Sequence, residues 1–113
     1  MTPSQLTPPT KTTLKRYGLT QEAWYIIGDM QDWRCAVCGE AFTPERRPVI
    51  DHEHVRGYHK MKFEKKAKFV RGLLHNWCNH RLVAKGMTTE RAYNIYQYLS
   101  DYSMRSEEND ETR

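Results

Sequence analysis

Hydrophobic residues recur at helical spacing in two stretches of the chain. In the first stretch, Trp24, Ile27 and Met30 form an apolar stripe, and the hydroxyl of Thr20 is placed to cap the helix that carries it. We expect this helix to extend to about residue 33. The second stretch predicts a final helix that begins near residue 88 or 89 and ends near residue 103. Its apolar face would be formed by Ala92, Ile95, Tyr96, Leu99 and Tyr102.

Two shorter apolar runs between these helices have the composition of strands. Residues 49–54 form the first run and residues 68–74 the second, and an antiparallel hairpin would join them through a long connection. A short helix is expected to follow from Cys78 to about residue 84. The sequence therefore predicts an α+β fold, in which a small hairpin is flanked by N- and C-terminal helices.

The 113 residues suit one small domain. We expect residues 1–16, rich in proline and threonine, to form a flexible arm, residues 17–103 the folded domain, and residues 104–113 an acidic disordered tail. Only 38% of the residues are hydrophobic, so the core needs added support, for example from a metal. No apolar run reaches the roughly 20 residues of a membrane-spanning helix, and no secretory signal is visible. A cytoplasmic protein without membrane contact is expected.

Two pairs of potential metal ligands each enclose a two-residue gap. Cys35 and Cys38 form one pair, His75 and Cys78 the other, and they include all three cysteines of the chain. Structural zinc takes four such ligands in a tetrahedron, so the spacing predicts a Cys3His zinc site. His80 is the alternative fourth ligand, although it would need a different geometry. A redox role for the cysteines would require a βαβ pattern, which is absent.

The connection between the two predicted strands is strongly basic. Residues 56–71 contain seven lysines and arginines and one acidic residue, with aromatic residues interleaved. A nucleic acid is the partner that suits this arrangement, although a solvated loop can have the same composition. The basic residues are Arg56, Lys60, Lys62, Lys65, Lys66, Lys68 and Arg71.

Oxygen ligands and a histidine occur close to these features. Asp51 and His52 lie in the first predicted strand, and Asn79 directly follows a proposed zinc ligand. Carboxylate and amide oxygens suit Mg²⁺ or Mn²⁺, and a neutral imidazole can take a proton from water. Together these groups supply what metal-assisted phosphodiester hydrolysis requires. Asp51 and His52 would face opposite sides of a regular strand, so the strand must end or bulge there for both to reach one phosphate.

Five short motifs occur in an order that resembles a known family. In combination they are similar to the phage recombination endonuclease VII family of the HNH, or ββα-metal, nucleases, over about residues 17–83. The motifs are Tyr17-Gly18-Leu19-Thr20, the pair Cys35 and Cys38, Asp51-His52-Glu53-His54, Val70-Arg71-Gly72-Leu73-Leu74, and Cys78-Asn79.

The resemblance implies a compact ββα-metal core stapled by zinc, with DNA as the substrate. It implies that His52 is the general base, that Asp51 and Asn79 hold one Mg²⁺ or Mn²⁺ ion, and that zinc takes no part in the reaction. His54 would contact the phosphate, and the basic residues of the connection would grip the DNA backbone with little sequence preference. A phage-encoded member would act in the cytoplasm of the host cell.

The chain departs from the family pattern at several positions. The family usually has a cysteine where this chain has His75, an acidic residue where it has Leu82, and a short turn in place of the basic connection. Two other functions therefore stay open beside a monomeric or homodimeric HNH endonuclease. One is a dimeric resolvase that cuts branched DNA such as Holliday junctions. The other is a zinc module that binds DNA without cutting it.

Overall fold

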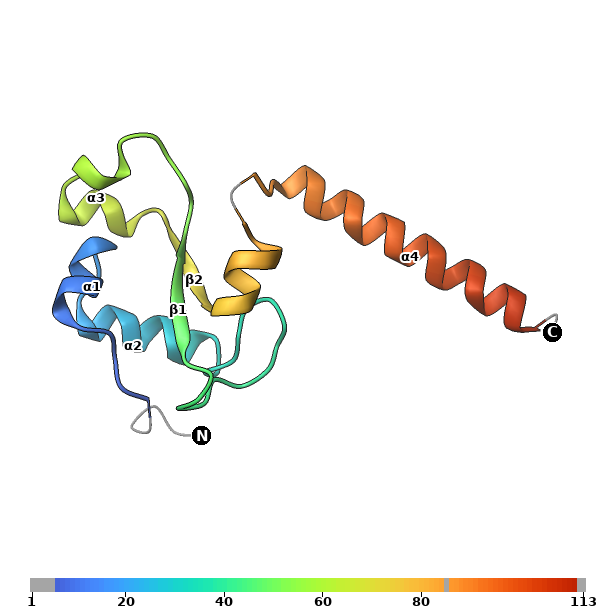
Figure 1. Cartoon of the computed structure of the whole chain (residues 1–113), viewed down its shortest axis with the longest axis horizontal. Helices are drawn as coiled ribbons and strands as arrows, with labels where there is room; N and C mark the ends of the chain where they lie inside the picture. The colour runs from blue at the N-terminus through green and yellow to red at the C-terminus, as the bar shows by residue number, and fades with distance from the viewer. Residues whose placement is uncertain (1–5, 85, 112–113) are drawn as a thin grey trace. The chain divides into compact units, whose positions relative to one another are not determined.

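The computed structural model describes residues 6–84 and 86–111, and it divides the chain into two units, Met1–Val83 and Ala84–Arg113. The second unit contains one helix, α4 (Thr89–Glu111). The mixture of helices and strands confirms the predicted α+β class (Figure 1). The first unit contains α1 (Lys11–Arg16), α2 (Gln21–Met30), β1 (Pro48–His52), η2 (Tyr58–Lys60), α3 (Phe63–Ala67), β2 (Val70–His75) and η3 (Cys78–Leu82).

Strands β1 and β2 form the two-stranded antiparallel sheet that the apolar runs predicted. Pro48 pairs with His75 and Ile50 with Leu73. β2 ends at His75, and the π-helical turn η3 begins three residues later. The end of β2 therefore lies beside the first residue of β1, and η3 begins next to this end of the sheet.

The hydrophobic core joins α2 to the sheet. Trp24, Phe42 and Leu73 are its largest fully buried side chains. Trp33 folds back over α2, with its ring centroid 5.1 Å from that of Trp24. A Cβ atom at Gly28 would lie 2.2 Å from the Trp33 indole, so a glycine at this point of α2 makes room for the turn.

Gln31 connects the end of α2 to β2. Its Oε1 accepts a hydrogen bond from the backbone N–H of Leu73, and its Nε2 donates to the carbonyl oxygens of Leu73 and Arg34, all at 2.9 Å. One amide side chain therefore satisfies both backbone groups of Leu73 on this side of the strand. The same bonds fix the turn that follows α2 against β2.

In place of the predicted flexible arm over residues 1–16, the described part of this segment is folded. Thr10 caps α1 by accepting a hydrogen bond from the Thr13 backbone N–H at 3.3 Å. Leu6 and Leu14 are both buried in the core. Two isolated leucines among prolines and threonines form no periodic pattern, so this packing cannot be predicted from the sequence. Residues 1–5 lie outside the described residues.

Helix α4 begins at Thr89, as predicted, but it continues beyond residue 103 to Glu111. Where the sequence predicted a disordered tail over residues 104–113, the structure therefore has helix up to residue 111, and residues 112–113 are not described. Methionine, arginine and glutamate favour the helix at these positions. Tyr96, Leu99 and Tyr102 on its apolar face are exposed. Among the residues that the structure describes, no helix is both long and apolar enough to cross a membrane.

The basic connection between the strands packs closely against Gly18 through helix α3. This glycine has φ +72°, and a Cβ atom there would lie 2.3 Å from the carbonyl oxygen of Phe63 and 2.7 Å from the backbone nitrogen of Ala67. Helix α3 can therefore rest on the turn after α1 only because residue 18 has no side chain.

We expect Gly18→Ala to destabilise the protein by about 3 kcal/mol, since it combines backbone strain with a clash. Gly57→Ala is the matched control, because Gly57 has φ +76° but a Cβ atom there would meet nothing within 4 Å. Its cost should be about 1 kcal/mol, from backbone strain alone. Thermal unfolding of both variants measures the difference. Equal losses of stability would contradict the proposed packing of α3 on Gly18.

Candidate functional site

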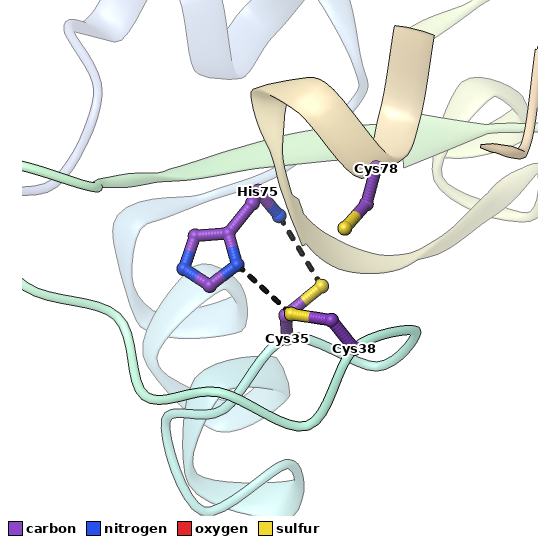
Figure 2. A group of neighbouring side chains, drawn as sticks. All are labelled: Cys35, Cys38, His75 and Cys78. Atoms are coloured by element: carbon purple, nitrogen blue, oxygen red, sulfur yellow. Dashed lines mark hydrogen bonds between the residues drawn. The ribbon is translucent and has the colours of Figure 1, made fainter. Parts of the chain in front are cut away.

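Four potential metal ligands meet between the turn after α2, the end of β2 and the start of η3. Figure 2 shows the side chains of Cys35, Cys38, His75 and Cys78 turned toward one another. Their ligand atoms all lie within 4.8 Å of one another, and the Nδ1 atom of His75 is 3.3 Å from the Cys38 sulfur. The structure thus confirms the cluster that the two spaced pairs predicted, with His75 rather than His80 as its fourth member.

The cluster fits a structural zinc ion. Zinc–sulfur bonds of about 2.3 Å in a tetrahedron place ligand sulfurs about 3.8 Å apart, so small movements would close this cluster on one ion. Cys35, His75 and Cys78 are buried, and Cys38 is exposed. Four protein ligands leave no open position for a substrate, which is typical of structural rather than catalytic zinc.

The ligand thiols differ in acidity without a metal. Two opposing effects act on the pKa of Cys35. Burial alone would raise this pKa, but hydrogen bonds from backbone N–H groups, including those of Cys38 and His75, have the larger combined effect. The net result is a lowered pKa. Burial raises the pKa of the Cys78 thiol to about 11, with further contributions from its two cysteine neighbours. Because zinc binds thiolates, its binding would release a proton from Cys78 at neutral pH.

A cleft of about 580 Å³ contains all three residues that the sequence proposed for catalysis. Asp51 and His52 reach it from the end of β1, and Asn79 reaches it from η3, one residue after Cys78. A metal ion on Cys78 would therefore also fix the helical turn that carries Asn79. The other residues around the cleft include Tyr17, Arg47, His54, Asn76 and His80.

An irregularity in the sheet explains how Asp51 and His52 can share one cleft. Asp51 pairs with Gly72, but His52 pairs with Val70, so Arg71 is an extra residue in β2. Such a bulge bends and twists the strand pair locally. The consecutive side chains of Asp51 and His52 consequently do not have to alternate as they would in a regular strand.

His52 lies among aromatic rings. It stacks on Tyr58 with centroids 4.6 Å apart and an interplanar angle of 26°, and its ring is 4.7 Å from His54 and 5.3 Å from Tyr17. Burial lowers the pKa of His52, and the charge of His54 adds to this effect. The ring is therefore predominantly neutral at pH 7, the form that accepts a proton. In the sequence, Tyr58 is one of the aromatic residues among the lysines of the connection, and no local pattern indicates that it lies at this site.

Arg71, which the sequence predicts as a DNA-binding residue, contacts another predicted site residue. Its Nε and Nη2 atoms donate to the two carboxylate oxygens of Asp51 at 2.8 and 2.9 Å. The remaining basic residues of the connection lie in or beside η2 and α3, and all of them are exposed except Lys66, which is half-buried with its ammonium 5.7 Å from the centre of the Tyr58 ring.

A divalent cation fits the oxygen donors of the cleft. Asp51 offers the carboxylate and Asn79 an amide oxygen, which are ligands of Mg²⁺ and Mn²⁺. A carboxylate has about four lone-pair positions, so the two hydrogen bonds from Arg71 leave positions for an ion. Among the residues around the cleft, Asp51 is the only acidic one.

Comparison with known proteins gives one family match and two curated relatives. Residues 10–102 match the family model described as recombination endonuclease VII. The Gene 59 protein of Mycobacterium phage D29 is 35% identical over 66 residues, which are 58% of this chain and 33% of that protein. The Gene 59 protein of Mycobacterium phage L5 is 33% identical over 66 residues, 58% of this chain and 34% of that protein. The match thus spans about a third of the length of these relatives. No solved structure matches the chain.

Proposed function

Because the chain belongs to the recombination endonuclease VII family, we propose that it is an endonuclease that hydrolyses DNA phosphodiester bonds with a divalent cation. We further assign it to the HNH, or ββα-metal, nucleases, with β1, β2 and η3 as the core. The observation that carries the proposal is the single cleft that Asp51, His52 and Asn79 line, next to the cluster of potential zinc ligands. The relatives are phage proteins, which supports action in the cytoplasm of an infected cell.

In the proposed mechanism, His52 takes a proton from the attacking water. Stacking on Tyr58 restricts the tilt of the imidazole, and burial keeps it neutral. Asp51 and Asn79 would hold Mg²⁺ or Mn²⁺, which supplies Lewis acidity at the scissile phosphate and the leaving oxygen. His54, which is exposed beside His52, would donate a hydrogen bond to the phosphate. Zinc would hold η3 to β2 and would not take part in the reaction.

Nicking of supercoiled plasmid tests this function. The protein should carry one zinc per chain and be dialysed free of other divalent metals, because a strong chelator would also remove zinc. We expect nicked or linear product only after Mg²⁺ or Mn²⁺ is added. A zinc-loaded protein that binds the plasmid but never cuts it, with either cation, would contradict the proposal and favour the non-catalytic DNA-binding module.

The exposed bases of the connection are proposed to hold the DNA backbone. Each phosphate contact contributes about −0.9 to the slope of log affinity against log salt concentration. Replacing Lys62, Lys65 and Lys68 with glutamine should therefore reduce the magnitude of this slope by about 3, with a weaker affinity for every DNA sequence. Fluorescence anisotropy at several NaCl concentrations, without divalent cation, measures the slope.

The matched control replaces the same three lysines with arginine. It keeps the charges and should keep the slope of the wild-type protein. A glutamine variant whose salt dependence equals that of the arginine variant would show that the connection is a solvated loop and not a DNA contact.

Branched DNA is the alternative substrate, because the family is described by its role in recombination. An exposed apolar face on α4 also suits a homodimer, as a resolvase would need to cut two strands of a junction. Cleavage of a synthetic four-way junction beside a linear duplex of the same arms distinguishes the two proposals. Equal rates on both substrates, from a protein that is monomeric by light scattering, would exclude the resolvase.

A further inference from the structure

The pair formed by Asp51 and Arg71 changes the charge of the cleft. The Asp51 side chain is 6% exposed and both of its oxygens accept hydrogen bonds from Arg71, whose side chain is 40% exposed. Two parallel charge-assisted bonds of this kind fix the carboxylate plane as well as its position. The bulge makes this possible, since Arg71 is the extra residue of β2 directly opposite the irregular step between Asp51 and His52.

No other acidic residue lines the cleft. Outside the lining, the charge of Glu53 adds to the raised pKa of Arg71, after the larger contribution of the Asp51 hydrogen bonds. Arg47 also lies at the cleft, with its guanidinium bonded to the Thr7 carbonyl oxygen at 2.6 Å. Asn76 and Asn79 are neutral. The paired carboxylate therefore contributes no net charge, and the cleft as a whole is neutral to positive when its histidines are neutral.

The oxygen donors of the cleft suit a dication, but its lack of net negative charge makes the cleft a weak site for one without DNA. Cation affinity rises with the number of charged ligands, and Mg²⁺ sites that have few carboxylates commonly depend on substrate phosphates. A DNA phosphate at the cleft would bring the negative charge that the protein does not provide. It would also attract Arg71, which is exposed enough to share its donors with a phosphate oxygen.

We propose that Arg71 makes cation binding in the cleft depend on DNA, because it neutralises Asp51 until a DNA phosphate supplies a second negative charge. Arg71 is thus a positioning residue that acts through Asp51. The inference rests on the proposed function, in which Asp51 and Asn79 hold the catalytic cation. Its consequence is that the free protein holds Mg²⁺ or Mn²⁺ weakly and assembles the complete site only on its substrate.

Binding of Mn²⁺, followed by the electron paramagnetic resonance signal of the free ion, tests this inference. The parent protein is the zinc-loaded His52→Ala variant, in which slow cleavage should preserve the DNA during the measurement, and Mn²⁺ bound by the same duplex alone is subtracted. We expect the duplex to tighten Mn²⁺ binding by about tenfold or more. Adding Arg71→Gln should tighten Mn²⁺ binding without DNA by about tenfold and reduce the effect of the duplex.

Two further variants identify the cause. Arg71→Lys keeps the positive charge, so its Mn²⁺ affinity without DNA should stay near that of the parent. Arg16→Gln removes an exposed arginine of α1 and should change nothing. Zinc content and thermal unfolding show whether each variant is folded. If Arg71→Gln is not folded, the parent and Arg71→Lys proteins still test the inference. Equal Mn²⁺ affinity of the parent with and without the duplex would overturn it.

Failure of the inference differs from failure of the proposed function. Mn²⁺ binding that Asp51→Asn abolishes, but that neither DNA nor Arg71→Gln changes, would overturn the role of Arg71 and leave the cation site in place. If Asp51→Asn has no effect on Mn²⁺ binding even with DNA present, the cation site itself is wrong, and both proposals fail.

Discussion

The His52→Ala variant is expected to cleave DNA about 10²- to 10⁴-fold more slowly than the wild-type protein, the range that a general base contributes. His52 is the half-buried histidine of the cleft, and its lowered pKa keeps it ready to accept a proton. Its ring stacks on Tyr58 and makes a tilted contact with Tyr17. His52 is not one of the four residues of the metal-ligand cluster. Zinc content and DNA affinity should therefore stay near those of the wild-type protein. Single-turnover cleavage of an end-labelled duplex measures the loss.

His59→Ala is the control for this variant. His59 lies in η2, is exposed, and does not line the cleft. It should retain the wild-type rate. If His52→Ala cuts as fast as His59→Ala under single-turnover conditions, His52 is not the base, and the mechanism proposed for this cleft must be abandoned.

Loss of the zinc site is expected to unfold the first unit. Cys78→Ser removes one of three sulfurs from a cluster that joins the turn after α2, the end of β2 and η3. Structural zinc contributes an apparent 10–16 kcal/mol in small domains at pH 7, which is comparable to or larger than the whole stability of such a domain. The variant should show no cooperative thermal transition and less than one zinc per chain. Circular dichroism and metal analysis measure both quantities.

The control for the zinc experiment is to remove the metal from the wild-type protein and then add it back. Wild-type protein unfolded by a chelator should regain its thermal transition when Zn²⁺ is added back in excess, but not when Mg²⁺ is added. A Cys78→Ser protein with the melting temperature of the wild type would contradict the structural role of the metal. Retention of the fold in chelator would lead to the same conclusion.

Features encoded by short spacing could be predicted from the sequence. The gap of two residues within each ligand pair indicated the zinc cluster, and the structure brings its four ligand atoms within 4.8 Å. Periodic apolar residues gave α2 and the start of α4, and Thr20 caps α2 as expected, by accepting a hydrogen bond from the Ala23 backbone N–H. Two apolar runs likewise gave the paired strands. Each of these signals lies within a few neighbouring residues, where spacing alone determines which side chains share a face.

Features that depend on distant contacts could not be predicted. The pairing of Arg71 with Asp51 requires a bulge, and no pattern of residues in β2 indicates where a strand gains an extra residue. The stacking of Tyr58 on His52 depends on how the long connection folds, and that connection packs against Gly18, a residue distant in the sequence. Leu14 is the buried residue of α1, a helix that is too short to show a periodic pattern of apolar residues. Basic composition likewise could not distinguish Arg71, which is paired with a carboxylate, from the other basic residues of the connection.

The central claim is that the cleft at the end of β1 holds a divalent cation against a DNA phosphate. The most direct test is a crystal of the zinc-loaded His52→Ala protein with a DNA duplex and Mn²⁺, with anomalous scattering recorded above the manganese and zinc edges. We predict a zinc peak among the three cysteines and His75, and a separate manganese peak in contact with oxygens of Asp51, Asn79 and a phosphate. A manganese peak elsewhere on the chain, or DNA bound away from this cleft, would contradict the account.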